Sequence, residues 1–506
     1  MRASGILMPV FSLPSPYGVG TLGKDAFEWI DFLKAAGQQY WQILPIGPTG
    51  YADSPYQSFS VFAGNPYWID LDLLISRSLL TRKDVAEAGL CNVPGTIDYS
   101  NLFNRRFDLL RKAAERIEKE NKELRLFCLE NAYWLTDYAL FMSIKTEQGM
   151  ISCQNWPDNL RLREEGALLE SSERLSNEIH FWSVLQFLFY EQWNDLKHYA
   201  NQKDIKIIGD IPIYVSQDSS DLWANRDLFQ VDCEGNMTSV SGCPPDHFNE
   251  TGQRWGNPLY DWQRHKQTDF AWWISRLSHA GRLFDSVRID HFRGIAAYYS
   301  IPDEYETATV GKWKKGPGKA FISEVKETLP DLMIIAEDLG YLTEGVRRLM
   351  KYSEFPGMKV MQFAFDDSES NDYLPHRYEK NSVVYTGTHD NATTREWERS
   401  ISRKEKAFAR KYLGLNLCGN LTRAMVRAAM SSVSDICIIP IQDWLKLGSK
   451  ARINTPGTAT GNWRFRVKKS MLTNKLAAKI RRMTKMYDRR FKDAKAKDAI
   501  EHMKKK

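Results

Sequence analysis

The sequence predicts a (β/α)8 barrel, in which eight parallel strands alternate with helices and close into a cylinder. Short apolar runs rich in β-branched residues recur along the chain. Each is followed by polar residues and a helical stretch, which is typical of buried parallel strands. Eight such runs occur, at residues 40–44, 67–71, 206–211, 284–289, 332–336, 359–365, 383–387 and 436–441. The rival fold is an open doubly wound sheet, but no Gly-x-Gly-x-x-Gly sequence follows the first run, which removes the commonest reason to prefer it.

Two long gaps between these runs predict insertions on the C-terminal face of the barrel. The second and third runs lie roughly 130 residues apart, about four times a usual βα unit, and we expect a mainly helical insertion at residues 72–200. Residues 217–270 are rich in Gly, Pro, Asn and Trp and predict a structured loop of the kind that borders an active site. We expect residues 1–506 to form one barrel unit without a C-terminal β-sandwich, because the segment after the eighth run is short and helical.

Composition narrows the class of protein. Hydrophobic residues make up 43% and charged residues 26% of the chain, the ordinary range for soluble globular proteins. The seven cysteines include no Cys-x-x-Cys pair, which argues against a zinc site and a disulfide framework and favours a reducing compartment, the cytoplasm. The N-terminus has no long apolar segment, so a signal peptide is not expected. No apolar run approaches the roughly 18 residues of a membrane span.

Positive charge is concentrated at the C-terminal end. Residues 464–506 contain 17 Lys and Arg against 4 Asp and Glu, a balance of +13, whereas the whole chain carries +6 and the remainder therefore −7. A basic segment can bind nucleic acid. This one has few interleaved aromatic residues and no nucleic-acid-binding motif, so we expect a solvated helix with a basic tail at residues 491–506 and no nucleic-acid partner.

Acidic residues follow several of the predicted strands. They occur in four segments, at residues 209–212, 288–293, 336–338 and 388–391. A lone Asp at a strand end more often caps a helix or a turn. Four such segments, two of which contain Asp-His or His-Asp, are harder to explain by capping. In a barrel these ends converge on one mouth, and grouped carboxylates there suit the cleavage of glycosidic bonds.

Arg-x-Asp-His at residues 288–291, Glu-Asp at 337–338 and His-Asp at 389–390 resemble the α-amylase clan. The wider sequence resembles its amylomaltase branch, the 4-alpha-glucanotransferases or disproportionating enzymes. The segments that carry this resemblance lie at residues 4–7, 12–18, 41–45, 53–58, 242–246, 252–258, 284–294, 335–340, 386–393 and 461–464. They occur in order from about residue 2 to about residue 490. The Ser-Pro-Tyr-Gln-Ser segment and the segment from Pro-Pro-Asp to Trp-Gly-Asn-Pro are specific to this branch.

The resemblance implies the transfer of an α-1,4-glucan segment to the 4-hydroxyl of an acceptor by a retaining mechanism. The donors would be maltooligosaccharides and α-1,4-glucans, and the acceptors glucose or maltooligosaccharides. It implies no cofactor and no metal site. By the same resemblance, Asp290 is the nucleophile, Glu337 the general acid/base, and Asp390 the carboxylate that binds hydroxyls of a distorted sugar ring. A retaining mechanism requires the first two carboxyl groups to lie about 5–5.5 Å apart.

Further residues are expected to support or bind the sugar. Arg288 lies two positions before Asp290, so both side chains should point the same way, and its charge should keep Asp290 ionised. His389 is expected to donate to the same sugar ring. Asp210 either supports the site or is structural. By resemblance, Tyr56 and Trp255 line the acceptor and donor grooves, and Asn257 of the same Trp-Gly-Asn-Pro segment binds substrate.

Two alternative functions are considered, and one residue departs from the family pattern. The catalytic residues of a transferase and of an α-glucan hydrolase are the same, because the two differ only in whether a sugar or water resolves the intermediate. A glucan-binding protein without catalysis is disfavoured, since all three carboxylates are present. Family members often read Asn-Trp-x-Trp-Arg near the end, where this chain has Phe465 in place of the second Trp.

Overall fold

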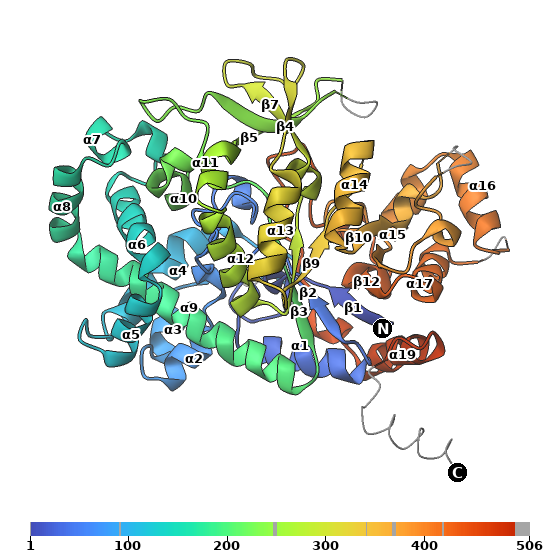
Figure 1. Ribbon diagram of the computed structural model, residues 1–506. Coiled ribbons are helices and arrows are strands. Elements are labelled where there is room, and N and C mark those ends of the chain that lie inside the picture. The colour runs from blue at the N-terminus through green and yellow to red at the C-terminus, as the bar shows by residue number, and fades with distance from the viewer. Residues whose placement is uncertain are drawn as a thin grey trace, which may run out of the picture.

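Eight parallel strands close into a barrel in the computed structural model, which describes residues 2–90, 93–245, 250–340, 342–366, 371–416 and 419–490. The predicted fold class is therefore confirmed (Figure 1). Around the barrel the strands are β1 (Ala3–Leu7), β12 (Ile436–Pro440), β11 (Ser382–Tyr385), β10 (Gly357–Val360), β9 (Met333–Ala336), β6 (Ser286–Ile289), β3 (Lys206–Ile211) and β2 (Tyr40–Gln42).

One of the eight predicted strands is wrong, and the structure replaces it with β1 at the N-terminus. Residues 67–71 instead span the end of a 3-10 turn, η3 (Pro66–Trp68), and the start of α2 (Leu71–Ser76). The caps explain the difference, because the Asn65 side chain accepts from the Tyr67 N–H at 3.0 Å and the Asp70 side chain accepts from the Leu73 N–H at 3.1 Å. The other seven runs each overlap a barrel strand, so residues 40–44 mark the second strand rather than the first.

Helices surround the barrel and alternate with its strands. They are α1 (Lys24–Ala35), α9 (Ser176–Gln202), α12 (Ala271–Leu283), α13 (Gly318–Thr328), α14 (Glu344–Ser353), α15 (Thr394–Ser400), α16 (Arg403–Tyr412), α17 (Leu421–Ser431), α18 (Ile441–Leu445) and α19 (Asn474–Met486). The buried Arg489 follows α19 and closes the N-terminal end of the barrel, because its guanidinium donates to the carbonyls of Ala3 and Ser434, each at 2.9 Å.

Between β2 and β3 the chain forms a helical layer on one flank of the barrel, at the left of Figure 1. After α2 its helices are α3 (Arg82–Glu87), α4 (Tyr99–Ala114), α5 (Lys122–Glu130), α6 (Ala132–Glu147), α7 (Asp158–Arg161), α8 (Glu165–Arg174) and α9. The long helix α9 packs against α4, α5 and α6 and also against α1 and β3, so it joins this layer to the barrel.

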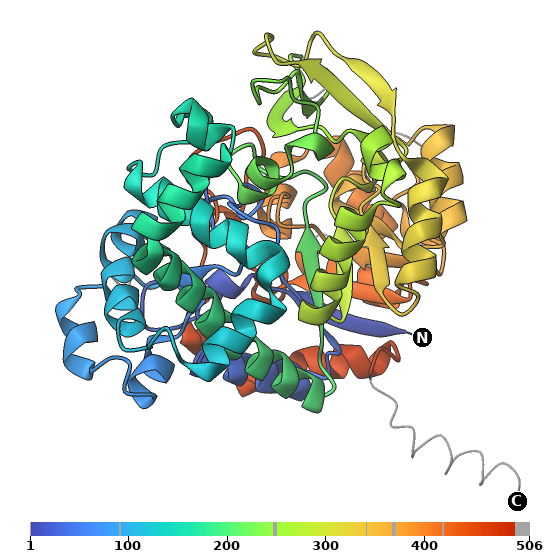
Figure 2. The same cartoon turned by 60° about the vertical axis from the view of Figure 1, so that its left-hand side comes forward.

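A small antiparallel sheet lies over one end of the barrel, at the top of Figures 1 and 2. Its strands follow the order β5 (Gln253–Pro258), β4 (Ser239–Cys243), β7 (Ala297–Pro302) and β8 (Lys312–Lys315). The segment interpreted as a loop at residues 217–270 therefore contains two strands, together with α10 (Ser220–Ala224) and α11 (Trp262–Gln267). Sequence periodicity missed this sheet, because its strands are short and β4 pairs with β7, which lies on the far side of β6 in the chain.

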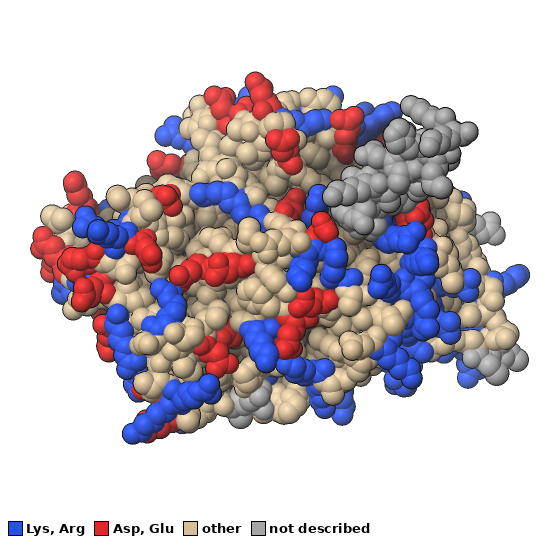
Figure 3. Space-filling model, turned by 90° about the horizontal axis from the view of Figure 1, so that it is seen from below, with Lys and Arg blue, Asp and Glu red and all other residues tan. Residues whose placement is uncertain are grey.

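Several exposed cations of the C-terminal segment lie on α19, which has no acidic residue. Its exposed side chains include Lys475, Arg481, Arg482 and Lys485. Figure 3 shows Lys and Arg gathered on the right-hand part of the molecule, where Figure 1 places α17 and α19. The basic tail expected at residues 491–506 lies outside the described residues. No helix within the described ranges is long and apolar enough to cross a membrane.

Candidate active site

The register of the barrel strands brings the predicted site residues together at the C-terminal end. Asp210 on β3 is the register partner of Arg288 on β6. Ile289 on β6 is the partner of Ala336 on β9, so the residues that follow, Asp290 and Glu337, leave neighbouring strands at the same level. The small sheet covers this end, since Trp255 of β5 meets the ring of His291 edge-on with ring centroids 4.7 Å apart.

Arg288 joins two carboxylates. Its Nη1 donates to both oxygens of Asp210, at 2.6 and 2.8 Å, and its Nη2 donates to Oδ1 of Asp290 at 2.7 Å. Burial works against the charged guanidinium, but the two carboxylates outweigh it and hold the pKa of Arg288 well above its ordinary value. The ion pair with Asp210 is buried, whereas the Asp290 side chain remains 28% exposed and can meet a substrate.

Glu337 is held by backbone donors. The N–H of His291 donates to Oε2 and the N–H of Leu339 to Oε1, both at 2.7 Å. His291 adopts the left-handed conformation, with φ of +50°, at the turn that directs its N–H toward Glu337. Burial and the nearby charge of Asp290 raise the pKa of Glu337 to about 7, so this carboxyl can both give and take a proton near neutral pH.

Asp390 contacts two polar side chains. Asn454 Nδ2 donates to its Oδ1 at 2.6 Å, and His389 Nε2 lies 3.3 Å from its Oδ2. Burial raises the pKa of Asp390, but the charge and hydrogen bond of His389 and the amide of Asn454 outweigh this effect and lower it to about 2. The side chain is 43% exposed, so an ionised carboxylate faces the open end of the barrel.

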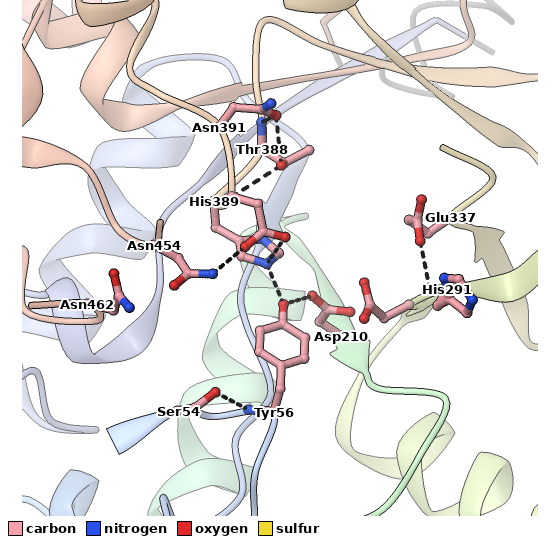
Figure 4. A network of polar contacts seen from close by, with 12 residues as sticks. Ser54, Tyr56, Asp210, His291, Glu337, Thr388, His389, Asn391, Asn454 and Asn462 are labelled. Carbon is pink, nitrogen blue, oxygen red and sulfur yellow. Dashed lines mark hydrogen bonds and ion pairs between the residues drawn. The ribbon is translucent and has the colours of Figure 1, made fainter. Parts of the chain in front are cut away.

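The Tyr56 hydroxyl connects Asp210, which binds Arg288, to His389, which lies beside Asp390 (Figure 4). This hydroxyl donates to Oδ2 of Asp210 at 2.8 Å and lies 2.8 Å from Nε2 of His389. Because the hydroxyl has only one proton, Nε2 of His389 must be the donor in the second contact. The two rings also stack, with centroids 5.3 Å apart and an interplanar angle of 16°.

The structure thus connects Asp210, Arg288, Asp290, Tyr56, His389 and Asp390 through direct contacts, and Glu337 joins them through His291. Trp255 borders the site through the same His291. Asn257 lies differently: its amide is buried and donates to the carbonyl of Val215 at 2.8 Å, which holds β5 against the segment after β3.

Sequence reasoning missed four residues that shape the site. His291 donates to Glu337, and Asn454 to Asp390. Arg452 donates to the Asp390 carbonyl at 3.1 Å, and Trp463 packs beside Tyr56 and His389. For Arg452 and Asn454 only their position after the eighth strand offered a signal, whereas His291 and Trp463 lie in segments that carry the family resemblance. Within the described part of the chain, no group of three or more His, Cys, Asp or Glu residues could hold a metal ion.

Carboxylates with contrasting environments at the C-terminal end of a (β/α)8 barrel define a class of enzyme that breaks glycosidic bonds. Within that class the chain belongs to the 4-alpha-glucanotransferase family, whose model matches residues 8–473. The chain is therefore an enzyme, and its reaction is a transfer.

Known relatives resemble the chain over almost its whole length. The 4-alpha-glucanotransferase of Clostridium butyricum is 48% identical over 485 residues, which cover 95% of this chain and 100% of the relative. That of Thermus thermophilus is 45% identical over 500 residues, with 96% and 99% covered. Among solved structures, the amylomaltase of Streptococcus agalactiae in complex with acarbose superposes with a TM-score of 0.94 at 40% identity, covering 97% of this chain and 100% of that one.

Proposed function

We propose that this enzyme transfers a segment of an α-1,4-glucan to the 4-hydroxyl of an acceptor sugar by two displacements that retain the anomeric configuration. Donors are maltooligosaccharides and longer α-1,4-glucans, and acceptors are glucose or maltooligosaccharides. The observation that carries this proposal is the contrast between two neighbouring carboxyls. Arg288 donates directly to Asp290, whereas Glu337 is buried with a pKa raised to about 7.

In the first displacement, Asp290 attacks the anomeric carbon of the donor. The hydrogen bond from Arg288 fixes the orientation of this carboxylate. Protonated Glu337 donates its proton to the departing 4-oxygen as the glycosidic bond breaks. A β-linked glucosyl ester of Asp290 forms, and the released chain leaves with a free 4-hydroxyl.

In the second displacement, the acceptor replaces the released chain. Glu337, now a carboxylate, removes the proton from the acceptor 4-hydroxyl as that oxygen attacks the anomeric carbon. The ester bond breaks, Asp290 becomes a carboxylate again, and the α-configuration is restored. This mechanism needs the two carboxyl groups about 5–5.5 Å apart.

The sugar at the cleaved bond would be held by Asp390 and His389. The partly exposed Asp390 carboxylate can accept from sugar hydroxyls, and Asn454 fixes its orientation. Asp210 is fully buried and already bonded to Arg288 and Tyr56, so its part is to support the other groups. Trp255, beside His291, offers an aromatic face on which a neighbouring sugar ring could stack.

We favour transfer over hydrolysis because the small sheet and its Trp255 border the site and could limit water while admitting a sugar. We further propose that residues 72–200 and 217–270 are insertions in one catalytic unit. We also propose that the enzyme works in a reducing compartment, the cytoplasm; the free thiols of the five described cysteines support this.

The test is an incubation with maltotriose and no added cofactor, followed by chromatography of the products. Wild-type protein should release glucose and form a ladder of longer maltooligosaccharides, and Asp290→Asn should do neither. Asp31→Asn, at an exposed position on α1, serves as the matched control and should behave as wild type. Glucose and maltose without longer products would favour the hydrolase. No products from wild-type protein, with longer glucans as well, would contradict the assignment.

A further inference from the structure

Trp463 has an unusual backbone conformation next to the site. Its φ is +62°, in the left-handed region that bulky side chains rarely adopt, and its side chain is buried. A residue remains in such a conformation only where its surroundings hold it there, and these outliers cluster at functional sites. The contacts of Trp463 therefore show what this conformation achieves.

Hydrogen bonds hold the backbone of Trp463 on both sides. Its N–H donates to the carbonyl of Ile453 at 2.7 Å, and its carbonyl accepts from the Tyr99 hydroxyl at 2.9 Å. The preceding Asn462 closes the loop from Thr455, because its side chain accepts from the Thr455 N–H at 2.9 Å. The chain is thus fixed before and after the indole, and it cannot relax without losing these bonds.

The indole packs against two residues of the site. Its ring centroid lies 5.8 Å from that of Tyr56 and 6.1 Å from that of His389, in tilted contacts. Because Tyr56 and His389 also stack on each other, the three rings form one cluster. The indole N–H donates no hydrogen bond within the described residues, so its effect on this cluster comes from ring packing.

This cluster sets the position of one hydroxyl group. Tyr56 Oη lies 2.8 Å from both Asp210 and His389, so it couples the Arg288 ion pairs to the residue beside Asp390. A shift of the Tyr56 ring would weaken both contacts, because each depends on the same oxygen.

We propose that Trp463 is a positioning residue whose left-handed backbone presses the indole against Tyr56 and His389 and so fixes the Tyr56 hydroxyl between Asp210 and His389. Trp463 touches neither reacting carboxyl, so it acts through these two residues. The inference rests on the proposed function, because it assumes that this network orients Asp290 and Asp390 during transfer.

Three substitutions separate the ring from the backbone. Trp463→Phe keeps a ring, Trp463→Ala removes it, and Trp463→Gly removes it while fitting the left-handed conformation, so Gly should give a higher unfolding temperature than Ala. Phe465→Ala is the matched control, since Phe465 is a buried aromatic residue two positions away and has no ring contact with Tyr56 or His389.

The readouts are kcat and KM for maltotriose disproportionation, together with thermal unfolding. We expect Trp463→Ala and Trp463→Gly to lower kcat equally, by about 10- to 100-fold, with KM little changed. Small misplacements of reacting groups slow the chemical step. The Trp463→Phe variant should retain most of the activity. The Phe465→Ala control should be less stable but keep the wild-type kcat.

The inference is overturned if Trp463→Gly keeps wild-type kcat, or if kcat follows unfolding temperature across all four variants. Wild-type protein that forms no transfer products would instead overturn the proposed function. Active wild-type protein with active Ala and Gly variants would overturn only the role of Trp463.

Discussion

Arg288 donates from Nη2 to Oδ1 of Asp290, two residues further along the chain, at 2.7 Å. The same guanidinium also binds both oxygens of Asp210 through Nη1. The planar fork of an arginine can serve the two carboxylates at once, whereas a lysine ammonium is a single point charge. The orientation of Asp290, the proposed nucleophile, therefore depends on the shape of Arg288 as well as on its charge.

Arg288→Lys should lower kcat for maltotriose disproportionation by about 100-fold or more, because the ammonium cannot bind Asp210 and orient Asp290 together. Fold should be retained, since a buried positive charge still faces Asp210. The matched control is Arg347→Lys, because Arg347 forms an exposed ion pair with Asp372. This variant should leave kcat unchanged. Wild-type kcat in Arg288→Lys would show that charge alone suffices.

Formation of the glucosyl-enzyme should depend on the protonation of Glu337. Its pKa, raised to about 7, keeps the carboxyl protonated below that pH, so kcat/KM should fall as the pH rises through about 7. A maltotriosyl fluoride needs no proton for its leaving group and should not show this alkaline decline. The same decline with both substrates would assign the titration to another group.

Asp390→Asn should reduce kcat by about 100- to 1,000-fold with a smaller change in KM, because a preorganised negative acceptor is lost at the sugar. The wild-type carboxylate, with its pKa lowered to about 2, is ionised throughout the working range. Asp372→Asn, an exposed carboxylate, is the control. A variant whose KM rises while kcat is preserved would limit Asp390 to ground-state binding.

Asp443 links the two ends of the loop that carries His389 and Asp390. This buried carboxylate accepts from the hydroxyls of Thr386, at 2.5 Å, and Thr394, at 2.6 Å, and also from the Thr394 N–H at 2.9 Å. Asp443→Ala should reduce the free energy of unfolding by about 2–4 kcal/mol, because buried donors lose their acceptor. Urea unfolding measures this change. An unchanged midpoint would mean that the loop is held by other contacts.

The sequence was sufficient to predict the barrel and the acidic residues at its strand ends, because both follow from local patterns. Residues such as Asp210 and Glu337 end or follow buried apolar runs, and closing the barrel brings those ends together. The error at residues 67–71 arose because short apolar runs do not distinguish a strand from a capped turn. The caps Asn65 and Asp70 were visible in the sequence and could have corrected it.

Other parts of the site depend on contacts between distant segments. Tyr56 reaches Asp210 across 154 positions of sequence, and Asn454 reaches Asp390 across 64. The left-handed conformation of Trp463 depends on Tyr99 and Ile453, so no local pattern predicts it. Asn257 shows the converse, because a residue in a recognisable segment donates to a backbone carbonyl rather than to the site carboxylates.

The most direct test of the covalent mechanism uses Glu337→Gln with a maltotriosyl fluoride that lacks the terminal 4-hydroxyl. Fluoride departs without acid assistance, and the ester should then persist because Gln cannot act as a base and the substrate cannot act as an acceptor. Mass spectrometry of the intact protein should show one added deoxymaltotriosyl group, and peptide mapping should place it on Asp290. The double variant with Asp290→Asn should show none. An adduct on another residue, or no adduct while fluoride is still released, would contradict the mechanism.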